Sequence, residues 1–152
     1  MSLLSTPHLC LLDTTTQTIG AAGTPQLVTF DTQVMASKIV KTSTSRFTVN
    51  EAGTYLVEVS AHVTAGVANK ILDLWARVNG TDVANSNTKT TVVNNEVKAL
   101  ALSFTLTMTA GQYLELWMNG DDTSLNLIAY AAGTTPTRPV TPSIRIDIER
   151  LP

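Results

Sequence analysis

Two histidines, one cysteine and twelve acidic side chains are the residues of this 152-residue chain that could act as bases, nucleophiles or metal ligands. His62 alternates with Ser60 and Glu58, so the three residue types of a hydrolytic triad occur in one short stretch. In an extended strand these side chains leave the same face in parallel, whereas a nucleophile, its base and its orienting group must point at one another. We therefore interpret the stretch as the polar face of a strand and expect no enzymatic activity.

Metal and cofactor chemistry has little support in the sequence. Cys10, the single cysteine, excludes a disulfide or a thiolate cluster within the chain, and its apolar run HLCLLD is typical of a packed cysteine. Asp121 and Asp122 in MNGDD offer oxygen ligands for calcium, but adjacent aspartates also commonly form turns. The stretch GAAGT is followed by neither a helix pattern nor a lysine, as a phosphate-binding loop requires. We expect no cofactor and no metal, with calcium left as an open alternative.

Trp75 and Trp117 are the two tryptophans, and each lies in a stretch that alternates as a β-strand does. An indole ring exposed on a sheet offers an apolar aromatic surface to a sugar ring, although tryptophan on such a surface often packs against protein instead. A glycan contact at Trp75 is therefore kept as an alternative interpretation.

Composition excludes several classes of partner. Charged residues make up 14% of the chain, where about 25% is typical of globular proteins. The net charge is −2, and without a cluster of Lys and Arg we expect no nucleic-acid binding. No apolar run approaches the ~18 residues of a membrane-spanning helix, so we expect no membrane insertion. The first residues, MSLLSTPHLCLL, lack the basic region of a secretory signal, which predicts synthesis in a cytoplasm.

Most of the chain alternates with a period of two, and turn residues separate the alternating stretches. The Asn-Gly pairs at 79–80 and 119–120 predict hairpins. Many short strands at this spacing favour an antiparallel β-sandwich. The predicted strands are 8–19, 26–34, 39–49, 54–65, 70–79, 81–88, 96–109, 112–119, 123–131 and 143–151.

Five of these strands have one aliphatic face, which we expect to form the core of the sandwich. The aliphatic faces are Tyr55, Val57, Val59, Ala61 and Val63; Leu72, Leu74, Ala76 and Val78; Leu100, Leu102, Phe104, Leu106 and Met108; Leu114, Leu116 and Met118; and Ile144, Ile146 and Ile148. Two similar stretches, AGTYLVEV and AGQYLELW, each lead into a predicted strand, but their tyrosines fall on different faces of the two strands. Tyr55 joins the aliphatic set of its strand, whereas Tyr113 falls opposite Leu114 and Leu116.

Three segments resemble the tumour necrosis factor-like jelly rolls, a superfamily that includes the globular heads of complement's first recognition component. FTVNEAGTYLVEVSAHV (47–63) resembles their opening core strand, LTMTAGQYLELWMNG their long strand, glycine turn and following strand, and PSIRIDIERL their terminal strand. The resemblance covers residues 39–151. The terminal strand departs from the aromatic-rich pattern of the family, because it carries isoleucines with charged residues between them.

The resemblance implies an all-β, antiparallel jelly-roll sandwich that forms a homotrimer. Carried over strand by strand, the faces opposite the aliphatic sets would contact neighbouring chains. The residues expected at the trimer interface are Leu56, Glu58, Ser60, His62, Tyr113, Glu115, Trp117, Arg145, Asp147 and Glu149. Because an unpaired buried charge is costly, we expect Arg145 to pair with Glu58, Glu115 or Glu149, within or between chains.

These features together predict a non-enzymatic virion structural protein of a bacteriophage. We expect a trimeric decoration (cement) protein that stabilises the phage head, bound to the major capsid protein or other virion proteins. A tail or fibre-tip protein that binds a receptor glycan is the alternative. Residues 1–25 lie outside the resemblance and are predicted to form an N-terminal docking arm, and residues 26–152 the jelly-roll domain.

Overall fold

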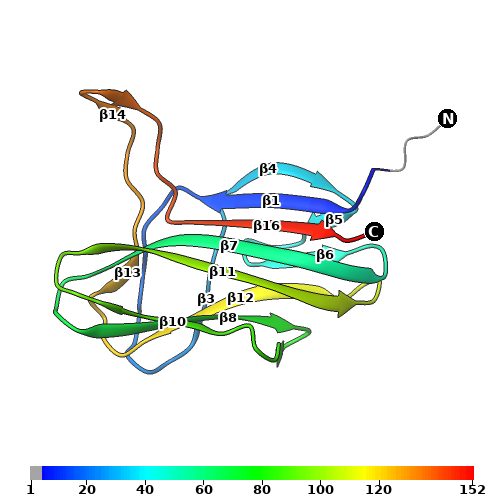
Figure 1. The fold of residues 1–152 in the computed structure, drawn as a ribbon, viewed down its shortest axis with the longest axis horizontal. Coiled ribbons are helices and arrows are strands. Elements are labelled where there is room, and N and C mark those ends of the chain that lie inside the picture. The colour runs from blue at the N-terminus through cyan, green and yellow to red at the C-terminus, as the bar shows by residue number, and fades with distance from the viewer. Residues whose placement is uncertain (1–4) are drawn as a thin grey trace.

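The computed structural model describes residues 5–152, which form two antiparallel β-sheets packed face to face (Figure 1). This confirms the predicted all-β jelly-roll sandwich. No helix long and apolar enough to cross a membrane occurs among the described residues. The strands are β1 (His8–Asp13), β2 (Gln17–Thr18), β3 (Gln26–Leu27), β4 (Thr32–Ser37), β5 (Ile39–Lys41), β6 (Arg46–Val49), β7 (Gly53–Ala65), β8 (Lys70–Val78), β9 (Thr81–Asp82), β10 (Thr88–Val92), β11 (Val97–Met108), β12 (Tyr113–Gly120), β13 (Leu125–Leu127), β14 (Gly133–Thr134), β15 (Thr137–Arg138) and β16 (Ile144–Arg150).

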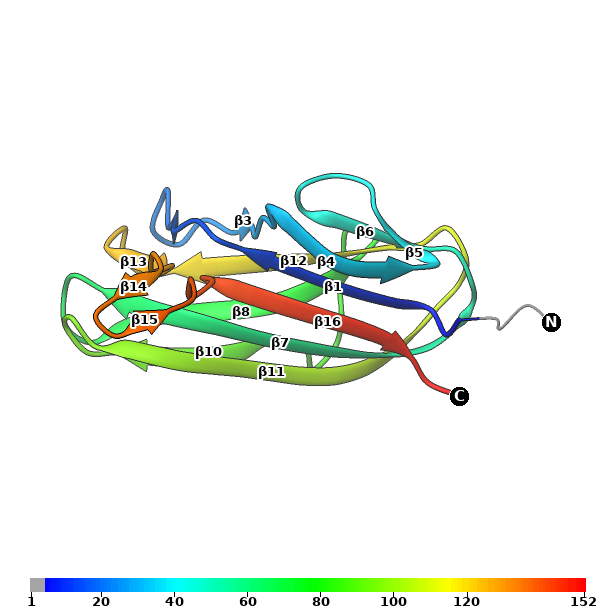
Figure 2. The same cartoon turned by 90° about the horizontal axis from the view of Figure 1, so that it is seen from above.

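The two layers, here called sheet A and sheet B, can be followed strand by strand in Figure 2. Sheet A has the order β4-β1-β16-β7-β11, and β13 and β2 extend it beyond β7. Sheet B has the order β10-β8-β12-β6-β5, with β3 beside β12 and β9 beside β8. β7 is the central strand of sheet A: β11 pairs with one of its edges, and β16 and β13 share the other. A separate hairpin, β14–β15, projects from one end of the sandwich, and the C-terminus lies at the other (Figure 1).

The core lies between the sheets and is built from the predicted aliphatic faces. From β7, Tyr55 is fully buried together with every second residue up to Val63. From β12, Leu114, Leu116 and Met118 point inward from the opposite sheet. The hydroxyl of Tyr55 donates to the Glu51 carbonyl at 2.6 Å, so the one polar atom of this side chain is satisfied. Burial of these alternating apolar sets is the main force that holds the two layers together.

The two Asn-Gly pairs play different roles. Asn79 and Gly80 have φ values of 48° and 80°, the positive pair that a tight two-residue hairpin requires, and they connect β8 to β9. The predicted hairpin at 119–120 is wrong, because β12 continues through Gly120. A Cβ atom on Gly120 would meet the side chains of Leu125 at 2.8 Å and Ile19 at 2.9 Å. This glycine therefore permits close packing of neighbouring chain segments.

The predicted docking arm, residues 1–25, contains part of the jelly roll. Residues 1–4 lie outside the described residues. Residues 8–13 form β1, which pairs with β16 on one side and β4 on the other, and Leu9 and Leu11 are buried in the core. A strand in the middle of a sheet cannot serve as a free arm, so the domain boundary at residue 25 does not fit this topology.

Candidate functional site

The outward face of sheet A collects the predicted interface residues of β7 and β16. Cross-strand neighbours form rows on this face, since directly paired residues point the same way. One row runs Met35, Cys10, Asp147, Glu58 and Ser103 across all five main strands. The parallel rows place Leu56 beside Glu149, Ser60 beside Arg145, and His62 beside Ala99.

The β11 side of this face has small, uncharged side chains. Ala99, Ala101, Ser103 and Thr105 are all exposed and point outward in alternation with inward residues of the same strand. At the opposite edge, Met35 of β4 leaves 53% of its surface exposed, and its neighbour Val34, at a β-bulge, 50%. Small side chains let another backbone approach closely, so the shape of this face suits contact with a second protein surface.

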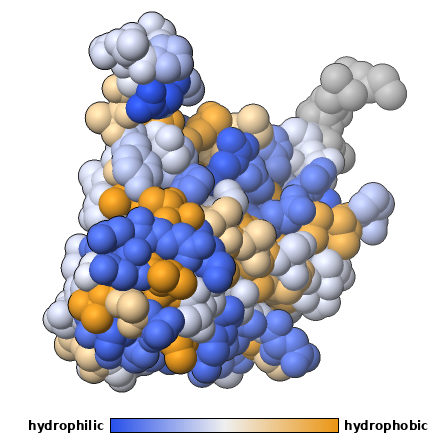
Figure 3. Space-filling model, turned by 60° about the vertical axis from the view of Figure 1, so that its left-hand side comes forward, coloured by the Kyte–Doolittle hydropathy of each residue, from blue (hydrophilic) through white to orange (hydrophobic). Residues whose placement is uncertain are grey.

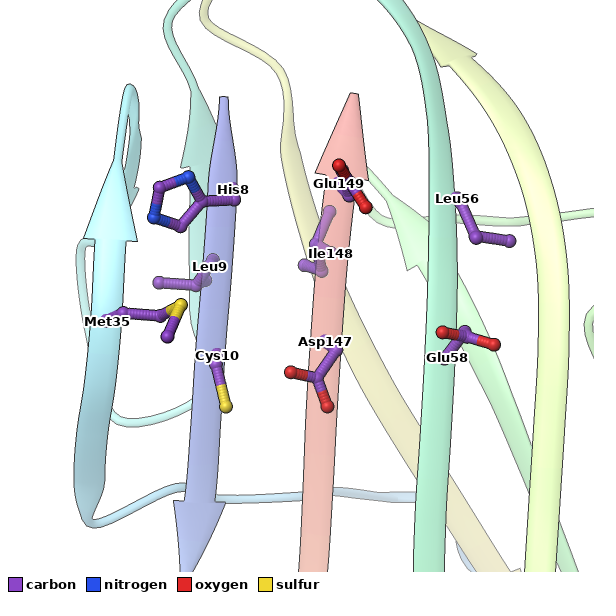
Figure 4. Close-up of a pocket in the computed structure, with 9 residues that line it drawn as sticks. All are labelled: His8, Leu9, Cys10, Met35, Leu56, Glu58, Asp147, Ile148 and Glu149. Atoms are coloured by element: carbon purple, nitrogen blue, oxygen red, sulfur yellow. The ribbon is translucent and has the colours of Figure 1, made fainter. Parts of the chain in front are cut away.

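Two hollows interrupt the outward face of sheet A. The first, about 270 Å³, lies over β4, β1, β16 and β7 (Figure 4), and the second, about 390 Å³, lies over β16, β7 and β11. Glu58 and Asp147 line both hollows. The remaining residues of the first are His8, Leu9, Cys10, Met35, Leu56, Ile148 and Glu149.

Cys10 lies beside Asp147 in the first hollow (Figure 4). Burial raises the pKa of the Cys10 thiol to about 11, and the neighbouring carboxylate acts in the same direction. Since the thiolate is the reactive form, Cys10 is a packed thiol and a poor nucleophile at neutral pH. Burial also opposes ionisation of Asp147, but hydrogen bonds from Arg145 and Cys10 outweigh it and hold the pKa of Asp147 below its usual value.

Arg145 pairs with Asp147, at 2.7 Å between Nε and Oδ2. The prediction of a partnership with Glu58, Glu115 or Glu149 is therefore wrong within the chain. Residues two apart on a strand share a face, so the guanidinium reaches the carboxylate of its own strand.

The predicted interface residues of β12 lie on the other side of the sandwich. Tyr113, Glu115 and Trp117 occupy the outward face of sheet B, so they cannot share one surface with the set on sheet A. Glu115 is only 4% exposed, and its Oε1 accepts hydrogen bonds from Nε and Nη2 of Arg46 at 3.0 and 2.9 Å.

Two arginines complete the contacts on that face. The guanidinium of Arg46 lies 3.8 Å from the ring centre of Tyr113, and that of Arg77 lies 4.2 Å from the ring centre of Trp117. Each of these three β12 side chains thus contacts an arginine of its own chain. Trp75 lies directly opposite Trp117 on β8 and lines a separate cavity on the same side of the molecule.

Of the triad-like residues of β7, His62 has a hydrogen-bond partner outside the set. Nδ1 of His62 lies 3.0 Å from the Pro142 carbonyl oxygen, in the segment that precedes β16. Within residues 5–152, no group of three or more His, Cys, Asp or Glu is placed to hold a metal ion. The two aspartates considered for calcium are turn residues: Asp121 accepts from the Ile71 amide and Asp122 from the Ser124 amide, each at 2.8 Å.

The end of the sandwich that carries the β14–β15 hairpin has a mixed surface (Figure 3). Apolar patches there are broken up by hydrophilic residues. Because a protein interface is usually a continuous patch, the outward face of sheet A is the stronger candidate.

Comparison with known proteins places the fold. No protein-family model matches the chain, and no curated protein matches it by sequence. Among solved structures, the globular domain of the zebrafish complement 1qA protein is similar with a TM-score of 0.65 and 14% identity, over 97% of this chain and 98% of that one. The crystal structure of murine APRIL at pH 5.0 is similar with a TM-score of 0.63 and 9% identity, over 97% of this chain and 100% of that one. The chain therefore has the jelly-roll fold of complement globular heads and tumour necrosis factor-like proteins.

Proposed function

We propose that the chain is a non-enzymatic structural protein that assembles as a homotrimer through the outward face of sheet A. The observation that carries this proposal is the row of exposed small residues on β11, Ala99, Ala101 and Ser103, on a sheet whose inward face already forms the core. These β11 residues are uncharged, so a contact made through them desolvates no charged group.

The charges on this face support a contact between chains. Glu58 lies directly opposite Asp147, and like charges in that position destabilise a sheet. Arg145 pairs with Asp147, whereas Glu58 belongs to none of the ion pairs found among residues 5–152. A cationic group from a neighbouring chain would relieve this arrangement. Threefold closure follows the assembly that the resemblance to tumour necrosis factor-like jelly rolls implies.

The biological setting that we propose is a bacteriophage virion, with the trimer as a head decoration protein. In such a trimer the three C-terminal ends lie at one end of the assembly. Ser5, Thr6 and Pro7 line a hollow of about 310 Å³ together with Leu151 and Pro152 at this end. An end where both described terminal segments meet is suited to docking on the major capsid protein.

The trimer is tested by measuring molar mass in solution with light scattering or sedimentation. Ala101→Arg places a long charged side chain on β11 and should convert trimer to monomer, while the matched control Thr91→Arg on the exposed face of sheet B should not. A wild-type monomer at high concentration, or equal effects of both variants, would refute the interface.

The virion role is tested by the copy number of the chain in purified phage particles, measured by quantitative mass spectrometry. Hundreds of copies per particle support head decoration. A few copies support the tail-tip alternative instead, and particles without the chain overturn both.

A further inference from the structure

A shallow cavity of about 320 Å³, wide open to solvent, lies on the outward side of sheet B, on the opposite side of the sandwich from the proposed trimer face. It lies between β8, the end of β12, the loop from β9 to β10 and the segment before β3. Its volume is at the lower end of the range for ligand pockets, about 300 to 1,000 Å³. The residues that line it are Pro25, Asp73, Trp75, Asp82, Val83, Asn85, Asn87 and Asn119.

Trp75 forms an aromatic wall of this cavity, and its ring is held in place. The indole Nε1 donates to Oδ1 of Asp82 at 2.8 Å, and Nε of Arg77 donates to the same oxygen at 2.6 Å. The Arg77 guanidinium lies 5.7 Å from the Trp75 ring centre. A wall fixed in this way needs little ordering when a ligand binds, and the entropic cost of binding is reduced.

The loop from β9 to β10, which carries Asn85 and Asn87, is also fixed in place. Ser86 is fully buried, and its Oγ accepts from the Ala76 amide at 3.0 Å and donates to the Val83 carbonyl at 2.8 Å. Asn85, next to it, is exposed and has a φ of 63°. The left-handed conformation at Asn85 sets the direction of the turn at the rim of the cavity.

The polar side chains around Trp75 are two carboxylates and three carboxamides. Asn87 donates to Oδ1 of Asp73 at 3.1 Å, which orients that carboxylate. Oδ1 of Asn119 is buried and has no hydrogen-bond partner among residues 5–152. A buried polar atom without a partner is costly, so a ligand that lets the Asn119 amide turn and bond would relieve that cost.

We infer that this cavity binds an uncharged carbohydrate, with one sugar ring stacked on Trp75 and its hydroxyls bonded to the surrounding Asn and Asp side chains. A hydroxyl both donates and accepts, as a mixed set of amides and carboxylates requires. None of the described residues that line the cavity is basic. Asp73 and Asp82 already have cationic partners beside the cavity, Lys89 at 3.6 Å and Arg77 at 2.6 Å, so no free cation is offered to a sialic acid or uronic acid. Hydrogen bonds from Arg77 and Trp75 lower the pKa of Asp82.

This inference does not rest on the proposed trimer. The cavity is formed by one chain, and association through sheet A would leave it open on the outside of the assembly. A trimer would present three such cavities, and avidity would strengthen weak binding to a surface that displays many copies of the sugar.

The test uses the full chain labelled with nitrogen-15 and titrated in solution, because this readout does not depend on oligomeric state. The probes are methyl α-mannopyranoside, methyl β-galactopyranoside, maltose and N,N′-diacetylchitobiose, with 3′-sialyllactose as the acidic counterpart. We expect at least one neutral probe to shift the Trp75 indole signal and the Asn85 and Asn119 amide signals.

Variants then separate this cavity from the rest of the surface. Trp75→Ala should weaken binding at least about tenfold, the scale of a lost aromatic contact. Asn85→Gly removes one amide while keeping the left-handed backbone, so it retains the fold and should also weaken binding. Tyr113→Phe, outside the cavity on the outward face of the same sheet, is the control and should bind as the wild type does. Absence of shifts with every neutral probe, tighter binding of the acidic probe, or unchanged binding by Trp75→Ala and Asn85→Gly would overturn the inference.

Discussion

Removing either partner of the Arg46–Glu115 pair should have unequal effects on stability. The carboxylate of Glu115 is almost fully enclosed, with 5% of its side chain exposed, whereas the Arg46 side chain is 44% exposed. Arg46→Met leaves a buried carboxylate whose only remaining hydrogen-bond donor among residues 5–152 is the Trp117 indole, at 3.3 Å. Loss of one partner of a buried pair costs about 3 to 5 kcal/mol, and the half-exposed arginine places this case near the lower end.

The opposite change, Glu115→Met, leaves an arginine that water can reach, so we expect it to lower the free energy of unfolding by only about 1 kcal/mol. The double variant should recover most of the stability lost in Arg46→Met. Urea denaturation at one fixed protein concentration measures all three variants, because self-association would make stability depend on concentration. If Glu115→Met proved as destabilising as Arg46→Met, the explanation by burial of the carboxylate would be refuted.

Three further predictions follow from single positions. Gly120→Ala should destabilise the fold by about 1 to 3 kcal/mol in thermal denaturation, because the added methyl meets Leu125 and Ile19; an unchanged melting temperature would contradict this. Cys10 should resist alkylation by iodoacetamide at pH 7.5 in the folded protein and react fully in urea, since its raised pKa keeps the thiol protonated; rapid reaction of the folded protein would count against it. The folded-state pKa of Asp147 lies below the usual 3.8, so this residue contributes stability above that pH, and the contribution is lost as pH falls through the folded-state value. Asp147→Asn should therefore flatten the loss of stability as pH falls below 3.8, and an unchanged acid profile would disprove the assignment.

Alternation along single strands predicted much of the core correctly. The period-two pattern predicts which side chains share a face of a strand. Burial of the alternate residues from Tyr55 to Val63 confirms this prediction for β7. It also explains why two similar phrases have different outcomes: Tyr55 is buried in the core and Tyr113 lies outside it, since the tyrosine enters each strand in a different phase.

The same pattern could not state which sheet a strand joins. Glu58 and Glu115 are both outward-facing in sequence, yet they lie on opposite sides of the molecule, because β7 belongs to sheet A and β12 to sheet B. The choice of sheet depends on pairing between strands that are far apart in the chain. For the same reason the sequence did not place residues 8–13 between β16 and β4.

By itself, then, the sequence determined the β-sandwich class, the inward and outward faces of its long strands and the hairpin at Asn79, because each of these depends on residues close together in the chain. Only the tertiary structure decided that Gly120 lies inside a strand, that Glu115 has a partner in Arg46, and that Trp75 shares a cavity with Asn85 and Asn119. Those features depend on side chains that approach one another only when distant strands pair and the two sheets close over a common core.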